Sequence, residues 1–163
     1  DHVESLPVVQ HAVNYYEVHF GVTYDYIIYL QPTAPLTRSE DISLCLKTLI
    51  DNHHVESVVA ITKVATHPFK MKRLLEDGRI VNYIDQGFED MRPRQELPPV
   101  YRRAGSIYAS KRDVIMKQNT LVGNPCIGVM VPSYTAIDID SHEDLELARL
   151  LYKKYVTSTN ECN

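Results

Sequence analysis

Two aspartates two residues apart are the first candidates for chemistry in this chain. Asp138 and Asp140 alternate with isoleucines in a segment that predicts a short strand over residues 136–140. Residues two apart in a strand share a face, so both carboxylates would project together, with Cα atoms about 6.5–7 Å apart. Carboxylates this close repel each other, and a hard divalent cation such as Mg²⁺ relieves that repulsion. The alternative is an acidic cluster at a helix N-terminus, because a serine and two more acids follow directly.

A group of arginines is the second candidate. The segment from His67 to Arg103 carries eight basic and six acidic residues, so its charge is +2 and that of the remaining chain is −6. Residues 91–103 alone hold four arginines and one glutamate. Arginines on a loop can form planar forks for a carboxylate or a phosphate. The alternative is a solvated loop whose arginines pair with neighbouring acids. Together, the aspartates and arginines suggest a small anionic substrate and a magnesium-bound phosphate.

Length and composition narrow the class of protein. The chain has 163 residues, which fits one domain, and a net charge of −4, which argues against a general nucleic-acid binder. No apolar run approaches the length of about 20 residues needed to span a bilayer, and the polar start does not resemble a signal peptide. Cys45, Cys126 and Cys162 lack paired spacing, so we expect reduced thiols in the cytoplasm, with Cys45 buried in a helix.

Helices and strands alternate along the sequence and predict an α/β fold. Apolar spacing of three and four predicts a helix over 3–20, ended by Gly21, and a run of aromatic and β-branched residues predicts a strand over 24–30. A helix over 39–52 and a strand over 57–64 complete a strand–helix–strand unit, which is typical of a parallel sheet with a right-handed crossover. Further strands are predicted at 106–109 and 127–131, and further helices from Ser110 and after Ser141.

Two of these helices carry caps and apolar stripes that can be read from the sequence. Ser39 and Ser141 are the expected N-caps. The predicted buried stripe of the second helix is Ile42, Leu46, Leu49 and Ile50, and that of the last helix is Leu145, Ala148, Leu151, Tyr152 and Tyr155.

The middle third of the chain differs from the rest. Residues 72–84 predict two short strands around Asp77-Gly78, a strong hairpin signal, and residues 85–103 are irregular with three prolines. This segment lacks the apolar residues for a core of its own. We therefore expect it to form an excursion from the main sheet.

Five further motifs are spread over nearly the whole chain. They are Leu30–Leu36 (LQPTAPL), His67–Lys70 (HPFK), Pro93–Pro99 (PRQELPP), Tyr101-Arg102 with Gly105–Tyr108 (GSIY), and Ile137–Ser141 (IDIDS). In this order they resemble the acylneuraminate cytidylyltransferases, which are also called CMP-sialic acid synthetases. A 3-deoxy-manno-octulosonate cytidylyltransferase is a related possibility, but the Pro-Arg-Gln-Glu-Leu-Pro run fits the acylneuraminate enzymes better.

The resemblance implies a Rossmann-like nucleotidyltransferase three-layer fold and a reaction. The anomeric hydroxyl of a nonulosonic, sialic-type sugar acid would attack the α-phosphate of CTP, giving the CMP-sugar and pyrophosphate. By this resemblance Asp138 and Asp140 hold Mg²⁺, and Arg94 acts with them in catalysis. The residues matched to the substrate pocket are Gln31, Lys70, Arg94, Arg102 and Tyr108.

The resemblance also bears on assembly. It implies one domain over 1–163 in which residues 66–103 form a dimerisation excursion that reaches the partner's active site, in a cytoplasmic homodimer with no nucleic-acid or membrane partner. The family's opening strands and its nucleotide-cradling loop (Ala-Arg-x-Gly-Ser-Lys-Gly) have no counterpart here, so we expect an N-terminally truncated fold with an exposed sheet edge that favours association with another chain. The alternative function is a non-catalytic dimeric module that has lost CTP binding.

Overall fold

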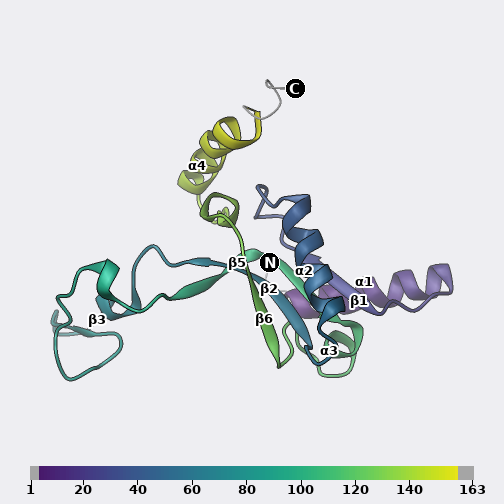
Figure 1. Cartoon of the computed structure of the whole chain (residues 1–163), viewed down its shortest axis with the longest axis horizontal. Coiled ribbons are helices and arrows are strands. Elements are labelled where there is room, and N and C mark those ends of the chain that lie inside the picture. The colour runs from purple at the N-terminus through teal and green to yellow at the C-terminus, as the bar shows by residue number, and fades with distance from the viewer. Residues whose placement is uncertain (1–3, 158–163) are drawn as a thin grey trace. The chain divides into compact units, whose positions relative to one another are not determined.

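The computed structural model describes residues 4–157 of the chain (Figure 1). Cys162, one of the predicted thiols, lies outside the described residues. The chain divides into two compact units: a larger one that runs up to Thr62 and resumes at Arg103, and a smaller one over Lys63–Arg102.

The larger unit is built on a mixed four-stranded sheet, with strands in the order β1-β5-β2-β6. Strand β5 lies between β1 and β2 and runs antiparallel to β1, whereas β2 and β6 are parallel. The predicted parallel sheet is therefore only partly right, because a strand from much later in the sequence separates the two strands of the expected strand–helix–strand unit. The strands are β1 (Tyr26–Leu30), β2 (Ser57–Lys63), β5 (Tyr101–Lys111) and β6 (Cys126–Met130).

Helices cover both faces of this sheet and make it the middle of three layers. Helix α1 (Ser5–Phe20) packs with Ile115 of the short helix α3 (Arg112–Met116) over Ile27 and Tyr29 of β1. Helix α2 (Ser39–Asp51) contributes to the core on the other face, which includes the alternate β1 residues Tyr26 and Ile28. The three-layer α/β prediction is confirmed for this unit, and α1 ends before Gly21 as expected.

The buried face of α2 is displaced by one position from the predicted stripe. Asp41, Cys45 and Leu49 are buried, whereas Ile50 is 40% exposed. Asp41 can enter the buried face because Arg38 binds it through two hydrogen bonds of 2.6 and 2.8 Å, which raises the pKa of the guanidinium. Arg38 also occupies the N-cap position and makes no capping side-chain bond. The prediction that Ser39 is the N-cap of this helix was therefore wrong.

The smaller unit contains the predicted hairpin. Strands β3 (Lys72–Leu74) and β4 (Ile80–Asn82) pair antiparallel on either side of a turn that includes Gly78, whose φ is +84°. The remainder of the unit is largely irregular, with short 3₁₀ helices at Pro68–Lys70 and Arg94–Glu96. The irregular segment is shorter than predicted, because β5 begins at Tyr101.

Residues 136–140 do not form the predicted strand. A 3₁₀ helix covers Ser133–Ala136, and residues 137–140 have no regular structure before α4 (His142–Tyr152), which continues into a π-helical turn, Lys153–Thr157. A capping box explains the change: Ser141 Oγ accepts from Asp144 N, and the Asp144 carboxylate accepts from Ser141 N, so these residues start a helix.

Helix α4 is far more exposed than its apolar stripe predicts. Of the five residues expected to face inward, only Ala148 is buried, and Tyr152 and Tyr155 are exposed. Within the part of the chain described, no helix combines the length and the hydropathy needed to cross a bilayer.

The two serines predicted as N-caps give a direct test of capping. Ser141→Ala removes the bond to Asp144 N and should lower the free energy of unfolding by about 0.5–2 kcal/mol. Ser39→Ala is the matched control and should change it by less than about 0.5 kcal/mol, since Ser39 makes no capping bond. Urea denaturation followed by circular dichroism measures both, and equal losses would contradict the capping role.

Candidate active site

The first part of the site is the loop that follows β1. Gln31 stays in register with the sheet, because its N–H donates to Ser106 O at 3.4 Å, and the chain then turns through a bond from Ala34 N to Gln31 O. Neither Pro32 nor Pro35 has an N–H to donate to a strand ladder, so the strand cannot continue. The Gln31 side chain therefore starts from the carboxyl end of β1.

A backbone hydrogen bond ties the aspartate segment to this loop. Ile139 N donates to Thr33 O at 2.9 Å, which holds the residues on either side of Ile139 next to the loop after β1. Asp138 is half-buried there, and its Oδ1 is shielded from solvent without a hydrogen-bond partner. It is the one buried side-chain oxygen or nitrogen in residues 4–157 with that property. An enclosed carboxylate oxygen without a partner is costly, so it is a strong candidate for binding a cation or a donor group.

Gly105 of β5 borders the same carboxylate. Its φ is +79°, and a Cβ atom placed on it would lie 3.2 Å from Asp138 Oδ2 and 3.4 Å from Gln31 Oε1. Gln31, Gly105 and Asp138, which come from three separate segments, thus meet at one point. Carboxylate and amide oxygens are ligands that suit Mg²⁺.

Asp140 has different surroundings from Asp138. It is exposed, and its backbone N–H donates to Asp144 Oδ2 at 3.2 Å, beside the capping box. The bonds from Ser141 and Asp140 lower the pKa of Asp144. The strand argument for paired carboxylates is therefore wrong, and the helix N-terminal alternative describes this backbone well. In the described residues, no three or more acidic, histidine or cysteine side chains gather as metal ligands.

Tyr108 lies further along β5 and packs against Tyr29, its neighbour in the register of β1. The two ring centroids are 5.9 Å apart, and the Tyr29 hydroxyl is 3.1 Å from Ser5 Oγ of α1. Tyr108 therefore stands on the face of the sheet that α1 covers.

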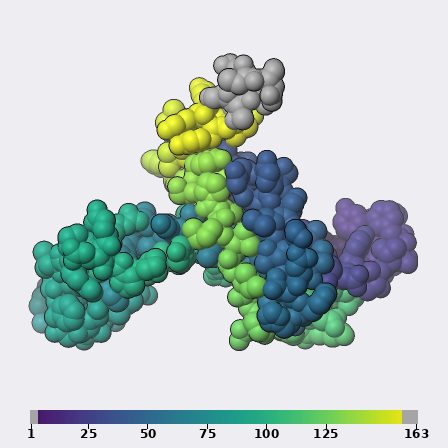
Figure 2. Space-filling view, in the orientation of Figure 1, coloured from purple at the N-terminus to yellow at the C-terminus, as the bar shows by residue number. Residues whose placement is uncertain are grey.

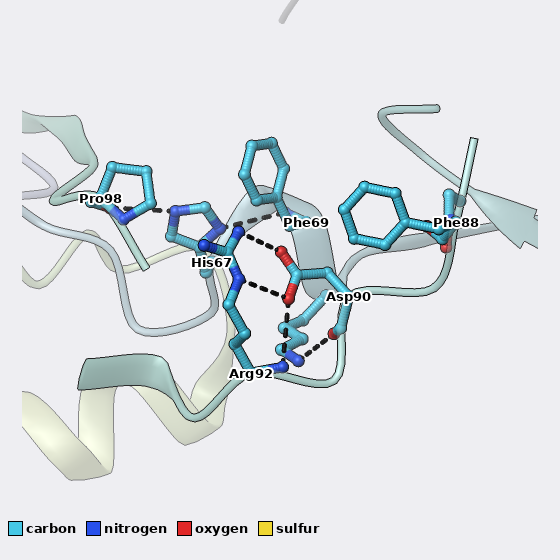
Figure 3. Close-up of polar contacts among 8 residues, drawn as sticks. His67, Phe69, Phe88, Asp90, Arg92 and Pro98 are labelled. Atoms are coloured by element: carbon cyan, nitrogen blue, oxygen red, sulfur yellow. Dashed lines mark hydrogen bonds and ion pairs between the residues drawn. The ribbon is translucent and has the colours of Figure 1, made fainter. Parts of the chain in front are cut away.

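The remaining predicted residues belong to the smaller unit, where His67 organises the backbone (Figure 3). The buried His67 ring accepts the Phe69 N–H at Nδ1, so Nε2 carries the proton that it donates to Pro98 O at 3.1 Å. This one ring joins the two family-like motifs of the unit, the one at Pro68 and the one at Pro98.

Lys70 and Arg92 are both bound to Asp90, and Figure 3 shows the pair of Arg92 with Asp90. Lys70 Nζ donates to the Asp90 carbonyl oxygen, and Arg92 binds the buried carboxylate through bonds of 2.7 and 3.1 Å. The Arg92 hydrogen bond is the main reason that the pKa of Asp90 falls to about 2, despite the opposing effect of burial. For Arg92, the alternative expectation is therefore correct: this loop arginine pairs with a neighbouring acid.

Arg94 lines a hollow of about 450 Å³ in the smaller unit. Its Nη2 donates to Val64 O, and the guanidinium is otherwise exposed beside Lys63 and the His67 ring. Arg102 is exposed at the start of β5. Sequence reasoning missed Asp90 and the role of Gly105, although a glycine inside a strand is a recognised signal of a bulge or of a close approach.

Comparisons with known proteins identify relatives of this chain. The chain is 27% identical to the post-translational flagellin modification protein B of Campylobacter coli and 26% identical to the pseudaminic acid cytidylyltransferase of Campylobacter jejuni, in each case over 94% of this chain and 64% of the relative. Other relatives are N-acylneuraminate cytidylyltransferases and CMP-N,N'-diacetyllegionaminic acid synthases. The chain is related to the cytidylyltransferases of sialic-type sugar acids. No family model matches it.

A solved structure resembles the fold of this chain. CMP:2-keto-3-deoxy-manno-octonic acid synthetase, determined with CTP, superimposes with a TM-score of 0.56 at 18% identity, over 96% of this chain and 70% of that one. The likeness confirms the nucleotidyltransferase fold predicted from the motifs. The chain spans slightly less than two thirds of the length of the flagellin and pseudaminic acid relatives.

The contact at Gly105 can be tested with a second glycine as control. Gly105→Ala forces a side chain into the left-handed region, which costs about 1–2 kcal/mol, and also crowds Asp138 and Gln31. Gly78→Ala also places a side chain on a residue with a positive φ, but its Cβ would meet nothing within 4 Å. In urea denaturation we expect Gly105→Ala to lose at least about 1 kcal/mol more than Gly78→Ala. A smaller loss at Gly105 would contradict the close approach.

Proposed function

We propose that this chain is a cytidylyltransferase that transfers CMP from CTP to a nonulosonic, sialic-type sugar acid with release of pyrophosphate. The observation that carries the proposal is the Asp138 carboxylate, whose Oδ1 is buried without a partner and whose Oδ2 lies near Gly105, as does Gln31 Oε1. The relatedness to N-acylneuraminate and pseudaminic acid cytidylyltransferases supports it. These relatives do not favour the alternative of a non-catalytic module.

We propose that Asp138, with Asp140 near by, binds Mg²⁺. The Asp138 carboxylate and Gln31 Oε1 fit a hard cation, because both supply oxygen ligands near Gly105 and Oδ1 of the carboxylate has no hydrogen-bond donor. When bound, the cation would neutralise charge on the triphosphate and activate the attacking hydroxyl. Gly105 keeps the backbone clear of these oxygens, so that Asp138 and Gln31 can approach the substrate.

We propose that cationic residues bind the acidic groups of the substrates. Arg94 keeps N–H groups beyond the one given to Val64, and it lies in a hollow that also carries Lys63. A guanidinium binds a carboxylate or phosphate in a planar, two-bond arrangement, so Arg94 would act with Arg102 on the sugar carboxylate or the phosphates. Lys70, in the smaller unit, and Tyr108, in the larger one, are each proposed to contact substrate.

We further propose that the protein is a cytoplasmic homodimer in which residues 66–103 form the dimerisation element, with no nucleic-acid partner. The segment coincides closely with the smaller unit, and it exposes Phe88 and Met91, which are apolar groups suited to an interface. Free thiols at Cys45 and Cys126 are typical of a reducing compartment.

Incubation with CTP, Mg²⁺ and a panel of sugar acids tests the activity. We expect pyrophosphate release with at least one of N-acetylneuraminic, pseudaminic, legionaminic or 3-deoxy-manno-octulosonic acid. Asp138→Asn should lower the rate about 100-fold or more and weaken Mn²⁺ binding followed by paramagnetic relaxation, because the metal contribution is several kcal/mol. Asp51→Asn, at an exposed carboxylate of α2, is the control and should change neither.

Two outcomes would contradict the activity. Absence of pyrophosphate with every sugar, together with no heat of CTP binding in calorimetry, would favour the non-catalytic module. An unchanged Mn²⁺ affinity in Asp138→Asn would reject the assignment of the metal to this carboxylate.

Sedimentation velocity tests the assembly. The unaltered chain should sediment as a dimer, and replacing Phe69–Tyr101 by a short Gly-Ser linker should give monomers. Arg94→Glu is the matched control: it should impair binding of the sugar acid but leave the dimer intact, because its role is in the hollow. An unchanged dimer after the replacement would contradict the role of residues 66–103.

A further inference from the structure

His67 is a buried titratable residue of the smaller unit, which is largely teal in Figure 2. Only 5% of its surface is exposed. The ring is hydrogen-bonded to two backbone groups, since Nδ1 accepts from Phe69 N at 3.2 Å and Nε2 donates to Pro98 O at 3.1 Å (Figure 3). It also packs against the Phe69 ring, with centroids 4.7 Å apart. Both hydrogen bonds together require a neutral ring with its proton on Nε2.

The two backbone groups belong to the segments that carry the proposed anion-binding residues. Phe69 is part of the 3₁₀ helix that ends at Lys70. Pro98 is separated by one residue from the 3₁₀ helix that starts at Arg94. The His67 ring therefore links the short helix of Lys70 to the short helix of Arg94.

A protonated His67 ring does not fit this position. An imidazolium carries an N–H on both nitrogens, so Nδ1–H would point at the Phe69 N–H, a donor against a donor. Burial leaves little room for water to accept from the new N–H, and an unpaired buried donor is costly. Two cations, Lys63 and Arg94, line the same hollow as His67, whereas the described residues that line it include no carboxylate. A charge on the ring would therefore also be repelled.

The acids of the neighbouring segments do not compensate for such a charge. The Asp90 carboxylate is bound to Arg92, and the Asp90 carbonyl oxygen accepts from Lys70. Glu96 is exposed to solvent and does not line the hollow. Protonation of His67 thus breaks one hydrogen bond and has no ion pair to offset the loss.

We propose that His67 is a positioning residue for the anion-binding groups at Arg94 and Lys70, and that only its neutral ring holds their two segments together. On protonation the ring must move away from the Phe69 N–H, and the link to Pro98 is lost with it. The inference rests on the proposed role of Arg94 in binding the sugar carboxylate or the phosphates. Its sign is diagnostic: loss of the link weakens anion binding at acidic pH, whereas a protonated ring that contacted the anion directly would strengthen it.

NMR spectroscopy of the chain tests the link without any turnover. Between about pH 8 and pH 5, where histidines change charge, the His67 ring nitrogens, the Phe69 amide and the Arg94 guanidinium should shift with one common midpoint. His67→Gln and His67→Asn cannot titrate, and they are designed to keep the donor to Pro98 O and the acceptor for Phe69 N, respectively. In either variant the Arg94 signals should stay constant over this interval. In the unaltered chain, Arg94 signals that do not change, or that shift with a different midpoint, would overturn the proposal.

The KM for the sugar acid gives a second readout. Over the same pH interval the KM of the unaltered chain should rise about tenfold or more as the pH falls, with a smaller change in kcat, because the loss of one charge-assisted hydrogen bond is of that size. His67→Gln should remove this rise. His54→Gln, at an exposed position, is the matched control and should behave as the unaltered chain does.

The two readouts separate failure of this inference from failure of the proposed function. A KM that falls at acidic pH would overturn the inference, because the ring would then bind the anion itself. Absence of turnover with every sugar acid would instead contradict the proposed function, and the Arg94 signals alone would then decide the role of His67.

Discussion

The bond from Ile139 N to Thr33 O is the constraint on which the candidate site depends. It joins the loop after β1 to the segment before α4, two stretches more than a hundred residues apart in sequence. It places Asp138, which lies between a 3₁₀ helix and an α-helix, next to the loop after β1, while the buried Ala136 anchors the same segment in the core. Because the bond is between backbone atoms, the side chains on either side of Ile139 remain available for ligands.

The two units hold complementary kinds of chemistry. The larger unit brings oxygen atoms together, namely those of Asp138 and Gln31, at a glycine that leaves room for them. The smaller unit instead presents cationic groups around a hollow beside a locked histidine ring. Oxygen ligands suit a hard cation, and guanidinium donors suit a carboxylate or a phosphate.

Local signals in the sequence predicted local structure well. The hairpin at Asp77-Gly78 and the helix that starts at Ser141 were correct, because turn and capping chemistry lies within a few residues. The alternation at 136–140 resembled a strand, but the cap and the bond to Thr33 fix that segment in another form. The enclosure of Asp138 and the approach of Gly105 could not be predicted, because both depend on contacts between distant segments.

The ion pairs of the smaller unit determine how its charge is distributed. Lys72, Arg79 and Arg92 are each bound to an acid of the same unit, at Glu89, Asp77 and Asp90 respectively. These pairs act as local dipoles whose fields decay quickly in salt water. The positive charge that these pairs do not offset lies on the other cations of the unit, among them the exposed guanidinium of Arg94. An incoming anion would experience a focused attraction there rather than a uniform basic surface.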